Sequence, residues 1–503
     1  MKRSTVLTPS VLVIAAGAAF ANDPFVLPPR VIYSEIPGDP TAVCPGTGGI
    51  EFTAFLDLHA SFDGNWWVFK AFINDAENDV IVYGNGTSAT GVLAAWEAHP
   101  TALGNGTSHN FLDSDCGIND NGEYCYGSRL DGATSTTDEI ILASDDVGGE
   151  FAAFLESEPA AGLFDSGPIG DEAFGNSLNS PSRLNDGTVN CKADQIQNIA
   201  SAYESALYIG SVPVAQEGVA VGDGNTYGGF IGLTGDLFDT SADGSSWIVE
   251  ADIDPAAIGT IEAVVVDSAV QIQDGDLLPG ASDVVDAVFG VRMTGSGDWM
   301  ARGDIPGDDD WAVFNFAGRG GLYFYTGDPI TPGNEETWGV SFLGINADDA
   351  GNYVIAGTTS NPDTNLDSVI VMNGDTVISR EGDAVDLDGN GMADDDVEIA
   401  SYSPNDLFIN PQGDVIAFVT LRRTSDGTAL GDAFVVIDAP GPGGPCNGAD
   451  LALPFEQLDF SDVILFLILF ADADPKVDYA APFGIVDFSD VIEFLLIFSA
   501  GCP

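Results

Sequence analysis

The sequence predicts a mainly β protein: a seven-bladed β-propeller with four-stranded blades, followed by a small module of two α-helices. Three observations lead to this prediction. A turn glycine just before a strand recurs seven times along the body of the chain. Each repeat holds about four short apolar or alternating segments, which is the strand content of a propeller blade. Near the C-terminus, an acidic loop followed by an apolar helix is present twice, at an offset of 28 residues.

The first 21 residues resemble a secretion signal. Lys2 and Arg3 precede an apolar stretch over 11–20, and the small residues around Phe20 fit cleavage after Ala21. We therefore expect an exported protein, extracellular or associated with the cell surface. No later run reaches the roughly 18 apolar residues that a membrane helix needs, so no direct membrane span is expected.

The predicted propeller occupies residues 22–438. Its turn glycines are Gly64, Gly122, Gly187, Gly244, Gly297, Gly351 and Gly413. A second marker, a strand that runs into a glycine turn, occurs at Gly218, Gly275, Gly327 and Gly382. Residues 31–33 resemble the last strand of a unit, whereas residues 434–437 resemble the third strand. The two ends of this region are therefore expected to complete one shared blade.

Several turn glycines follow a polar residue by three positions, as in Asn119-x-x-Gly122 and Asn410-x-x-Gly413. With the pair Ala417-Phe418 behind the latter glycine, this pattern resembles a bacterial tandem-repeat family with the tag Asn-x-x-Gly-x-x-Ala-Phe. The sequence departs from the tag because Leu184 replaces the polar residue in the third unit and the Ala-Phe pair lies one place late. The resemblance implies a secreted or surface repeat protein of unknown ligand, and no catalytic residue.

A Pro/Gly-rich linker over residues 439–445 leads to the C-terminal module, residues 446–503. Each copy of the duplicated segment has apolar residues at the i, i+3, i+4, i+7 spacing of one helical face. These residues are Val463, Phe466, Leu467 and Phe470 in the first copy, and Val491, Phe494, Leu495 and Phe498 in the second. The opposite face of the first helix is also apolar, which predicts either a partner surface there or packing against the propeller. Because so short an exported module buries little core, we expect a Cys446–Cys502 disulfide to bracket it.

This module resembles the dockerin-type anchoring domain of secreted bacterial proteins, in its Gly-Cys-flanked variant. The resemblance implies attachment to a cohesin-like or other envelope protein. It places the partner-recognition pairs at Phe460-Ser461 and Phe488-Ser489, and calcium-binding carboxylates in both loops. The matching carboxylates are Asp450, Asp459 and Asp462 in the first copy, and Asp478, Asp487 and Asp490 in the second. Ala and Pro replace the other ligands, so the loops either bind Ca²⁺ weakly or have exchanged the metal for Pro-Phe packing.

Another candidate calcium loop lies inside the predicted propeller. Its oxygen ligands at positions 1, 3, 5 and 9 are Asp386, Asp388, Asn390 and Asp394, with the Met392 carbonyl at position 7. Val397 stands where a bidentate Glu is expected, which leaves Glu398 or Asp396 as a substitute. A plain acidic turn is the alternative, since Asp, Asn and Gly are common in turns.

Six cysteines in an exported chain favour disulfides, and Cys116 and Cys125 are near enough in sequence to close a small loop. Cys44 and Cys191 would then either pair or remain free. The balance of 14 Lys and Arg against 78 Asp and Glu gives a net charge of −64, which excludes nucleic acid as a partner.

No catalytic residue is assigned, because the three histidines form no zinc motif and no nucleophile elbow is present. The sequence therefore predicts a secreted propeller that works as a binding or display module, with polysaccharide as a candidate ligand. The alternative is an exported polysaccharide-active enzyme, a glycosidase or lyase. That alternative requires Asp or Glu, Arg or His side chains to converge at one end of the propeller channel.

Overall fold

The computed structural model describes residues 28–86, 90–103, 105–134, 137–144, 149–164, 170–222, 224–230, 237–254, 261–307, 309–438, 460–471, 477 and 488–500. The chain divides into two compact units, Leu27–Ala439 and a second unit that contains Pro440–Pro503. The predicted signal peptide (1–21), the linker (439–445), Cys446, Cys502, Asp450, Asp459, Asp478 and Asp487 lie outside the described residues.

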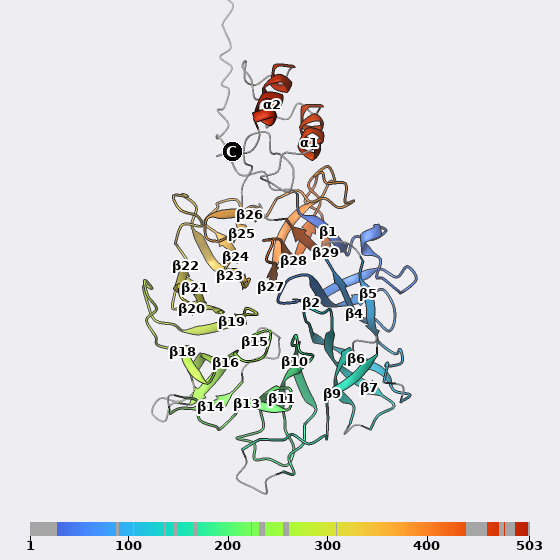
Figure 1. Ribbon diagram of the computed structural model, residues 1–503, viewed down its shortest axis with the longest axis vertical. Helices are drawn as coiled ribbons and strands as arrows, with labels where there is room; N and C mark the ends of the chain where they lie inside the picture. The colour runs from blue at the N-terminus through green and yellow to red at the C-terminus, as the bar shows by residue number, and fades with distance from the viewer. Residues whose placement is uncertain are drawn as a thin grey trace, which may run out of the picture. The chain divides into compact units, whose positions relative to one another are not determined.

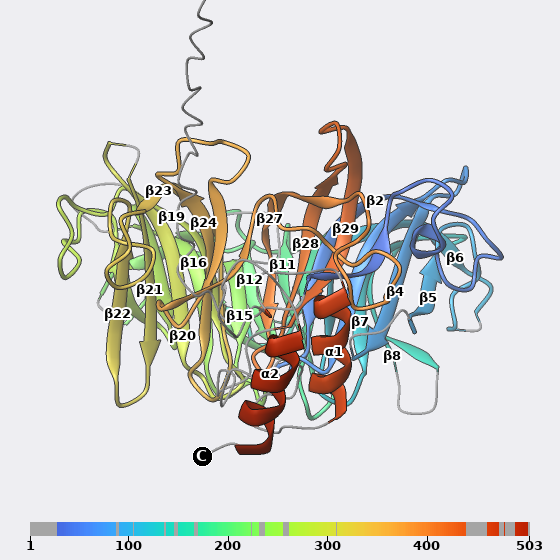
Figure 2. The same ribbon diagram turned by 90° about the horizontal axis from the view of Figure 1, so that it is seen from above.

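The first unit is a seven-bladed β-propeller, as predicted, with its antiparallel sheets arranged in a ring (Figure 1). In the side view of Figure 2, the strands run between the two faces of the ring. Blade 1 is β2 (Phe52–Ala60), β3 (Trp66–Ile73), β4 (Asp79–Asn85) and β5 (Val92–Trp96). Blade 2 is β6 (Ser108–Ile118), β7 (Tyr124–Asp131), β8 (Glu139–Ser144) and β9 (Glu150–Leu155). Blade 3 is β10 (Ser177–Arg183), β11 (Val189–Asp194), β12 (Ala206–Ile209) and β13 (Val212–Gln216).

The fourth blade differs from the others in its first strand. Two short strands pair with β16 in succession, so that the innermost position is divided between them. The strands of this blade are β14 (Thr226–Gly229), β15 (Phe238–Thr240), β16 (Trp247–Asp254), β17 (Ile261–Val266) and β18 (Ala269–Gln273). Blade 5 is β19 (Ala287–Met293), β20 (Trp299–Ile305), β21 (Asp309–Phe316) and β22 (Gly320–Tyr325). Blade 6 is β23 (Trp338–Ala347), β24 (Tyr353–Thr359), β25 (Ser368–Met372) and β26 (Thr376–Arg380).

The seventh blade joins the two ends of the propeller region, which confirms the predicted shared blade. Its strands from inside to outside are β27 (Glu398–Ile409), β28 (Val415–Arg422), β29 (Ala429–Ile437) and β1 (Arg30–Ser34). β1 pairs antiparallel with β29, and a short 3-10 helix, η1 (Pro40–Ala42), follows it. The ring is therefore closed by hydrogen bonds between the first and the last strand of the unit.

The repeated turn glycines connect the first and second strands of the blades. All seven have φ between 63° and 91°, a region that favours glycine, and each precedes the second strand of its blade by a few residues. The polar residue three positions earlier stabilises this turn. In blade 2 the Asn119 side chain accepts hydrogen bonds from the backbone N–H groups of Asn121 at 3.0 Å and Glu123 at 2.9 Å.

The hydrophobic core consists of seven clusters, one at each junction between neighbouring blades. The cluster between blades 7 and 1 contains Trp67, Phe69 and Phe434, which are almost completely buried. Burying one such large side chain contributes about 1.5–3 kcal/mol. Because every blade is apolar on both faces, no blade can be removed without exposing two of these clusters.

Acidic side chains on the innermost strands also link the blades. In each case a carboxylate on one blade accepts a hydrogen bond from a backbone N–H of the next blade. These bonds run from Cys116 N to Asp57 Oδ2 (3.2 Å), Ser180 N to Asp115 Oδ2 (2.7 Å), Met293 N to Asp239 Oδ2 (2.8 Å) and Leu58 N to Asp406 Oδ1 (3.1 Å). Part of the high acidic content therefore has a structural role at the propeller axis.

The proposed disulfide between Cys116 and Cys125 is wrong, because both are free thiols in the structure. Cys116 on β6 lies opposite Tyr126, whereas Cys125 on β7 lies opposite Gly117. This offset of one position directs the two side chains to opposite faces of the sheet. Cys44 and Cys191 are free and buried as well, and burial raises the pKa of the Cys125 and Cys44 thiols to about 12. Thiols of this kind are unreactive near neutral pH.

The C-terminal unit contains the two expected helices, α1 (Phe460–Ala471) and α2 (Phe488–Ala500). Phe466, Phe494 and Val477 form its buried centre, and Val463, Leu465, Leu469, Phe470, Val491 and Phe498 pack around them. The predicted apolar stripe is wrong at Leu467 and Leu495, which are 53% and 50% exposed. Each follows the central phenylalanine directly, and one residue turns an α-helix by about 100°. The described helices are too short to span a membrane.

Candidate ligand-binding cleft

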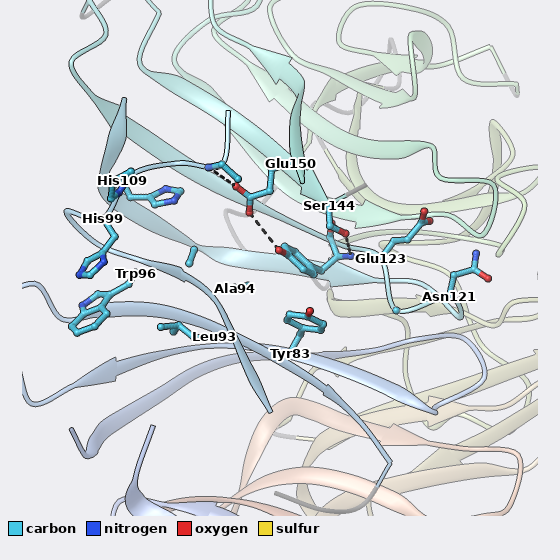
Figure 3. A pocket seen from close by; sticks show the side chains of 15 residues that line it. Tyr83, Leu93, Ala94, Trp96, His99, His109, Asn121, Glu123, Ser144 and Glu150 are labelled. Atoms are coloured by element: carbon cyan, nitrogen blue, oxygen red, sulfur yellow. Dashed lines mark hydrogen bonds between the residues drawn. The ribbon is translucent and has the colours of Figure 1, made fainter. Parts of the chain in front are cut away.

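A cleft of about 620 Å³ lies between blades 1 and 2 of the propeller (Figure 3). Strands β4 and β5 provide one wall, and β7, β8 and the start of β9 provide the other. Clefts that take small molecules measure about 300–1,000 Å³, so this one is large enough for a ligand of several rings. The repeat markers did not indicate it, because its residues come from two repeats and only one marker glycine, Gly122, is among them.

An aromatic pair forms the outer part of the cleft. The rings of Trp96 and His99 are stacked, with centroids 4.2 Å apart and an interplanar angle of 10°. The Trp96 Nε1 donates a hydrogen bond of 2.7 Å to the Glu77 carbonyl, which holds the indole in place. Figure 3 shows the two rings side by side at one end of the cleft.

A second aromatic pair faces a carboxylate in the middle of the cleft. The rings of Tyr83 from blade 1 and Tyr124 from blade 2 are 4.6 Å apart. Glu150 accepts a hydrogen bond of 2.8 Å from the Tyr126 hydroxyl and one of 3.3 Å from the Ala102 backbone N–H. Burial raises the pKa of Glu150, and these hydrogen bonds oppose that effect. The Tyr124 hydroxyl also donates a hydrogen bond of 3.5 Å to Glu150, so the carboxylate is held at the cleft wall (Figure 3).

The other end of the cleft is polar. Glu123 accepts a hydrogen bond of 2.6 Å from Asn119 Nδ2 and lies 3.7 Å from the Arg183 guanidinium. The neighbouring Asn121 is exposed, although its amide also donates a hydrogen bond of 3.0 Å to the Asn185 carbonyl. The cleft thus presents aromatic surfaces at one end and carboxylate and amide oxygens at the other.

His109 also lines the cleft but does not supply a charge. Its Nδ1 lies 3.0 Å from the Ser128 hydroxyl, and its side chain is buried against Tyr126. Burial lowers the pKa of His109 to about 4, so the ring is neutral at pH 7. The carboxylates of Glu150 and Glu123 consequently make the cleft electronegative.

The propeller axis contains a smaller cavity of about 60 Å³, lined by residues from the inner strands of all seven blades. It brings together His59, Arg292 and Asp239. These are residue types that the enzyme alternative requires close to one another in the propeller channel. Arg292 lies over the Phe408 ring at 5.1 Å and donates a hydrogen bond to the Asn405 carbonyl at 3.1 Å. Burial and the charge of Arg292 lower the pKa of His59 to about 3. The ring is a poor proton acceptor at neutral pH, and the cavity is far smaller than a sugar-binding site.

The candidate calcium loop, which connects β26 of blade 6 to β27 of blade 7, brings three carboxylates together. Oxygen atoms of Asp386, Asp388 and Asp395 lie within 4.8 Å of one another. The EF-hand spacing of the sequence predicts Asp394 as a ligand, but in the structure Asp395 lies in its place beside Asp386 and Asp388. The Asp394 carboxylate instead accepts a hydrogen bond of 3.2 Å from Asn390 Nδ2, and the Asn390 Oδ1 accepts one of 2.8 Å from the Met392 N–H. Three hard oxygen ligands suit Ca²⁺.

This loop is attached to the strand that closes the ring. The Asp386 side chain is 2% exposed and accepts hydrogen bonds from the N–H groups of Gly389 and Gly391, each at 2.8 Å. The Asp386 backbone bonds to the Pro29 carbonyl at 2.9 Å and to the Val31 N–H at 3.0 Å. The order of the loop is therefore coupled to the position of β1.

In the tail, the structure places only part of the predicted site. Phe460, Ser461 and Asp462 lie in the first turn of α1, and Phe488, Ser489 and Asp490 lie in the first turn of α2. Phe488 is 71% exposed, as a partner-recognition residue must be, whereas Asp490 is fully buried. Ligation by the tail carboxylates remains a prediction.

Comparisons with known proteins identify no family: no family model and no curated protein matches the chain. Among solved structures, the polysaccharide lyase Uly1 is similar with a TM-score of 0.40 and 11% identity, over 82% of this chain and 97% of that one. The β-propeller domain of the Trilobed protease from Pyrococcus furiosus has a TM-score of 0.38 and 8% identity, over 77% and 96%. The hydrazine synthase of Kuenenia stuttgartiensis gives 0.35 and 11%, over 79% and 99%. These likenesses are distant, and no activity is inferred from them.

Proposed function

We propose that this chain is an exported binding protein whose propeller holds a neutral polysaccharide in the cleft between blades 1 and 2. The observation that carries the proposal is the pairing of two aromatic surfaces, Trp96 with His99 and Tyr83 with Tyr124, around the fixed carboxylate of Glu150. Sugar rings stack their C–H faces on aromatic side chains, while carboxylates and amides accept hydrogen bonds from sugar hydroxyls.

The charge of the cleft defines the class of sugar. Glu150 and Glu123 lie at its wall, in a chain with a net charge of −64. An acidic polysaccharide would be repelled by this field, whereas a neutral one is not. The volume of about 620 Å³ is large enough for more than one sugar ring, which favours a segment of a polysaccharide over a single small sugar.

A binding role is favoured over the enzyme alternative for a physical reason. The axial cavity, where charged side chains converge, measures about 60 Å³, and its histidine is neutral and poorly basic at pH 7. In the larger cleft, burial lowers the pKa of His109 to about 4, so this ring is a poor proton acceptor at neutral pH. We therefore assign no catalytic residue.

The tail supplies the second half of the proposal, attachment to a cohesin-like or other envelope protein. Support comes from the duplicated sequence, from the exposure of Phe488 and from the resemblance of the segment to dockerins. Export follows from the resemblance of residues 1–21 to a signal peptide. We further propose that Asp386, Asp388 and Asp395 bind Ca²⁺, which is abundant outside cells, and so hold β1 in the ring.

The cleft assignment is tested by binding of the mature protein to immobilised neutral polysaccharides (cellulose, xylan, mannan and a mixed-linkage glucan), with polygalacturonate as the acidic comparison. We expect at least one neutral polymer to bind and Trp96→Ala to weaken that binding about thirtyfold, as loss of a large aromatic contact does. Phe289→Ala is the matched control, because Phe289 is 43% exposed and lies outside the cleft. Equal binding by the Trp96 variant, or a preference for polygalacturonate, contradicts the assignment.

Attachment is tested by fractionating cells that express either the intact chain or a chain that ends at Ala439. Retention in the envelope that depends on the tail supports anchoring. An unchanged location of the shorter chain contradicts the anchoring proposal and leaves the cleft proposal untouched.

A further inference from the structure

A lysine is buried beside an aspartate in blade 1, in a chain that has only 14 basic residues. Lys70 lies on β3 with its Nζ 3.7 Å from Asp79 Oδ2 on β4. The two side chains are 3% and 4% exposed. Neither the cleft nor the calcium loop uses this pair.

The strand register fixes the two side chains on one face of the sheet. Phe72 on β3 lies directly opposite Asp79, and Lys70 precedes Phe72 by two positions. Residues two apart on a strand point to the same face, so the lysine reaches the aspartate diagonally across the strand pair. The approach of the two groups is therefore built into the backbone.

The backbone of Leu112 in blade 2 brackets the pair. Its N–H donates a hydrogen bond of 3.2 Å to Asp79 Oδ2, and its carbonyl accepts a hydrogen bond from Lys70 Nζ. An amide between the two side chains would need one acceptor for its N–H and one donor for its carbonyl. Leu112 already supplies both groups: its carbonyl accepts from the lysine nitrogen, and its N–H donates to Asp79 Oδ2, which would become the amide oxygen.

The surroundings disfavour two separate charges. Lys70 is 2% exposed, so its ammonium is removed from water, and the Phe111 ring at 4.6 Å and the Phe72 ring at 5.5 Å from Nζ offset only part of this loss of hydration. Burial lowers the pKa of Lys70, although the charges of Asp79 and Asp113 oppose this shift. A buried ion pair loses the hydration of both ions, whereas an amide carries no charge.

A third acidic group is available to hold a proton. Asp113 Oδ2 is buried and has no hydrogen-bond partner among the described residues. Burial raises the pKa of Asp113, and the Lys70 charge opposes this effect. Gly127 leaves the room that this carboxyl needs, since a Cβ there would lie 2.8 Å from Asp113 Oδ2.

We propose that Lys70 and Asp79 condense to an isopeptide bond that joins β3 and β4 covalently. The proton of the Lys70 ammonium passes to the Asp79 carboxylate, which gives an amine and a carboxylic acid. The nitrogen lone pair attacks Asp79 Cγ, the bond from Cγ to Oδ1 breaks, and Oδ1 leaves as water with a proton that Asp113 supplies and regains from the nitrogen. One C–N bond forms, one C–O bond breaks, and nothing is oxidised or reduced.

Proximity makes this reaction feasible without an enzyme. Groups held in a reactive geometry reach effective concentrations of about 10⁵–10⁸ M, which offsets the unfavourable condensation of free acids and amines in water. Because both side chains are almost completely buried, bulk water has little access to the bond once it has formed. The pair Lys192 and Asp194 provides an internal comparison, because its 3.2 Å contact is shorter but Asp194 is 18% exposed.

Mass spectrometry of the purified mature protein tests the proposal. The protein should be lighter by one water molecule than its sequence requires, and trypsin should fail to cleave after Lys70, because the modified side chain has lost its charge. Fragmentation of the digest should join Lys70 to Asp79 and leave Lys192 and Asp194 unlinked. A full sequence mass together with normal cleavage after Lys70 overturns the proposal.

Three variants distinguish the role of the two reacting residues from the role of Asp113 as the proton donor. Lys70→Arg and Asp79→Ala should both show the mass of their sequences. Asp113→Asn keeps both reacting groups and should condense at least tenfold more slowly, as judged by mass after defined times of incubation. Condensation of Asp113→Asn at the wild-type rate contradicts the role of Asp113, and a water loss that persists in Asp79→Ala contradicts the assigned pair.

Discussion

The rings of Phe466 and Phe494 are stacked, with centroids 4.0 Å apart and an interplanar angle of 12°. The two residues are equivalent in the duplicated segment, so each copy of the repeat packs its central side chain on the same side chain of the other copy. Both are almost completely buried. The duplication therefore produces a core that is complementary to itself, and neither copy can form this core alone.

Loss of this contact should loosen the tail and leave the propeller intact. Phe466→Ala removes a buried ring, which costs about 3–5 kcal/mol. Ile464→Ala is the control on the same helix, since Ile464 is 47% exposed. Limited proteolysis of the full-length protein should cut the Phe466 variant rapidly within residues 446–503 and spare the control. Equal resistance of the two variants argues against the stacked core.

The turn glycine of blade 1 should tolerate no side chain, because blade 7 touches it. Gly64 has φ of 63°, and a Cβ there would lie 2.3 Å from the Asn410 Cβ. Gly86 is matched in φ, at 65°, but a Cβ there meets nothing within 4 Å. Both alanine variants carry a backbone cost of about 1–2 kcal/mol. Gly64→Ala should lose about 1–3 kcal/mol more from the clash, measured by urea unfolding. Equal losses contradict the close contact of the two blades.

Stability should fall as the pH rises, because several buried carboxyls prefer to be protonated. Burial, aided by the charge of Glu262, raises the pKa of Glu250 to about 8, and the Oε2 atom of Glu250 has no hydrogen-bond partner among the described residues. The folded chain therefore binds this proton more tightly than the unfolded chain, whose Glu pKa is about 4.3. The contribution is fully present below pH 4.3 and is lost progressively up to about pH 8.

The pH effect is measured by urea midpoints at pH 5, 7 and 9. Glu250→Gln should make the decline with pH shallower, since its amide does not ionise. The exposed Glu335 provides the control, and Glu335→Gln should follow the wild type. A decline of the same slope in the Glu250 variant assigns the effect to other groups, such as Glu139, whose pKa burial raises to about 7.

Calcium should stabilise the propeller through Asp395 and not through Asp394. Asp395 contributes to the triad with Asp386 and Asp388, whereas Asp394 lies outside it. Calcium at 100 times its dissociation constant stabilises a folded protein by about 2.7 kcal/mol. The melting temperature of the wild type and of Asp394→Asn should rise with added Ca²⁺, and that of Asp395→Asn should not. If only the Asp394 variant fails to gain stability with Ca²⁺, then Asp394 is the ligand, as the sequence pattern predicts.

The propeller could be predicted from the sequence because its repeat leaves local signals. Each turn needs a residue with positive φ, and Gly122 and Gly413 each lie two residues before a second strand. The divided inner strand of blade 4 left no such signal. The pairing of Cys116 with Cys125 failed because sequence distance does not reveal the face of a sheet, and a register offset of one reverses it.

The candidate cleft was beyond prediction for a different reason. Trp96 and Glu150 lie on different blades, and they come together through the packing of blade 1 against blade 2. In the candidate calcium loop, the spacing of the sequence pattern selects Asp386 and Asp388, but the path of the chain brings Asp395 rather than Asp394 beside them. Local patterns therefore predict elements well, whereas the side chains that meet in space depend on the path and packing of the chain.

The closure of blade 7 by β1 has a consequence for the synthesis and folding of the protein. The Glu35 carboxylate accepts a hydrogen bond from the Asp432 N–H, across 397 residues of sequence. β1 therefore leaves the ribosome long before its partner β29, and it stays unpaired until nearly the whole propeller has been synthesised. Contacts so distant in sequence form slowly, and an unpaired strand edge invites association with other chains in the meantime. Production of this protein in a foreign host should therefore be limited by aggregation through the unpaired strand β1.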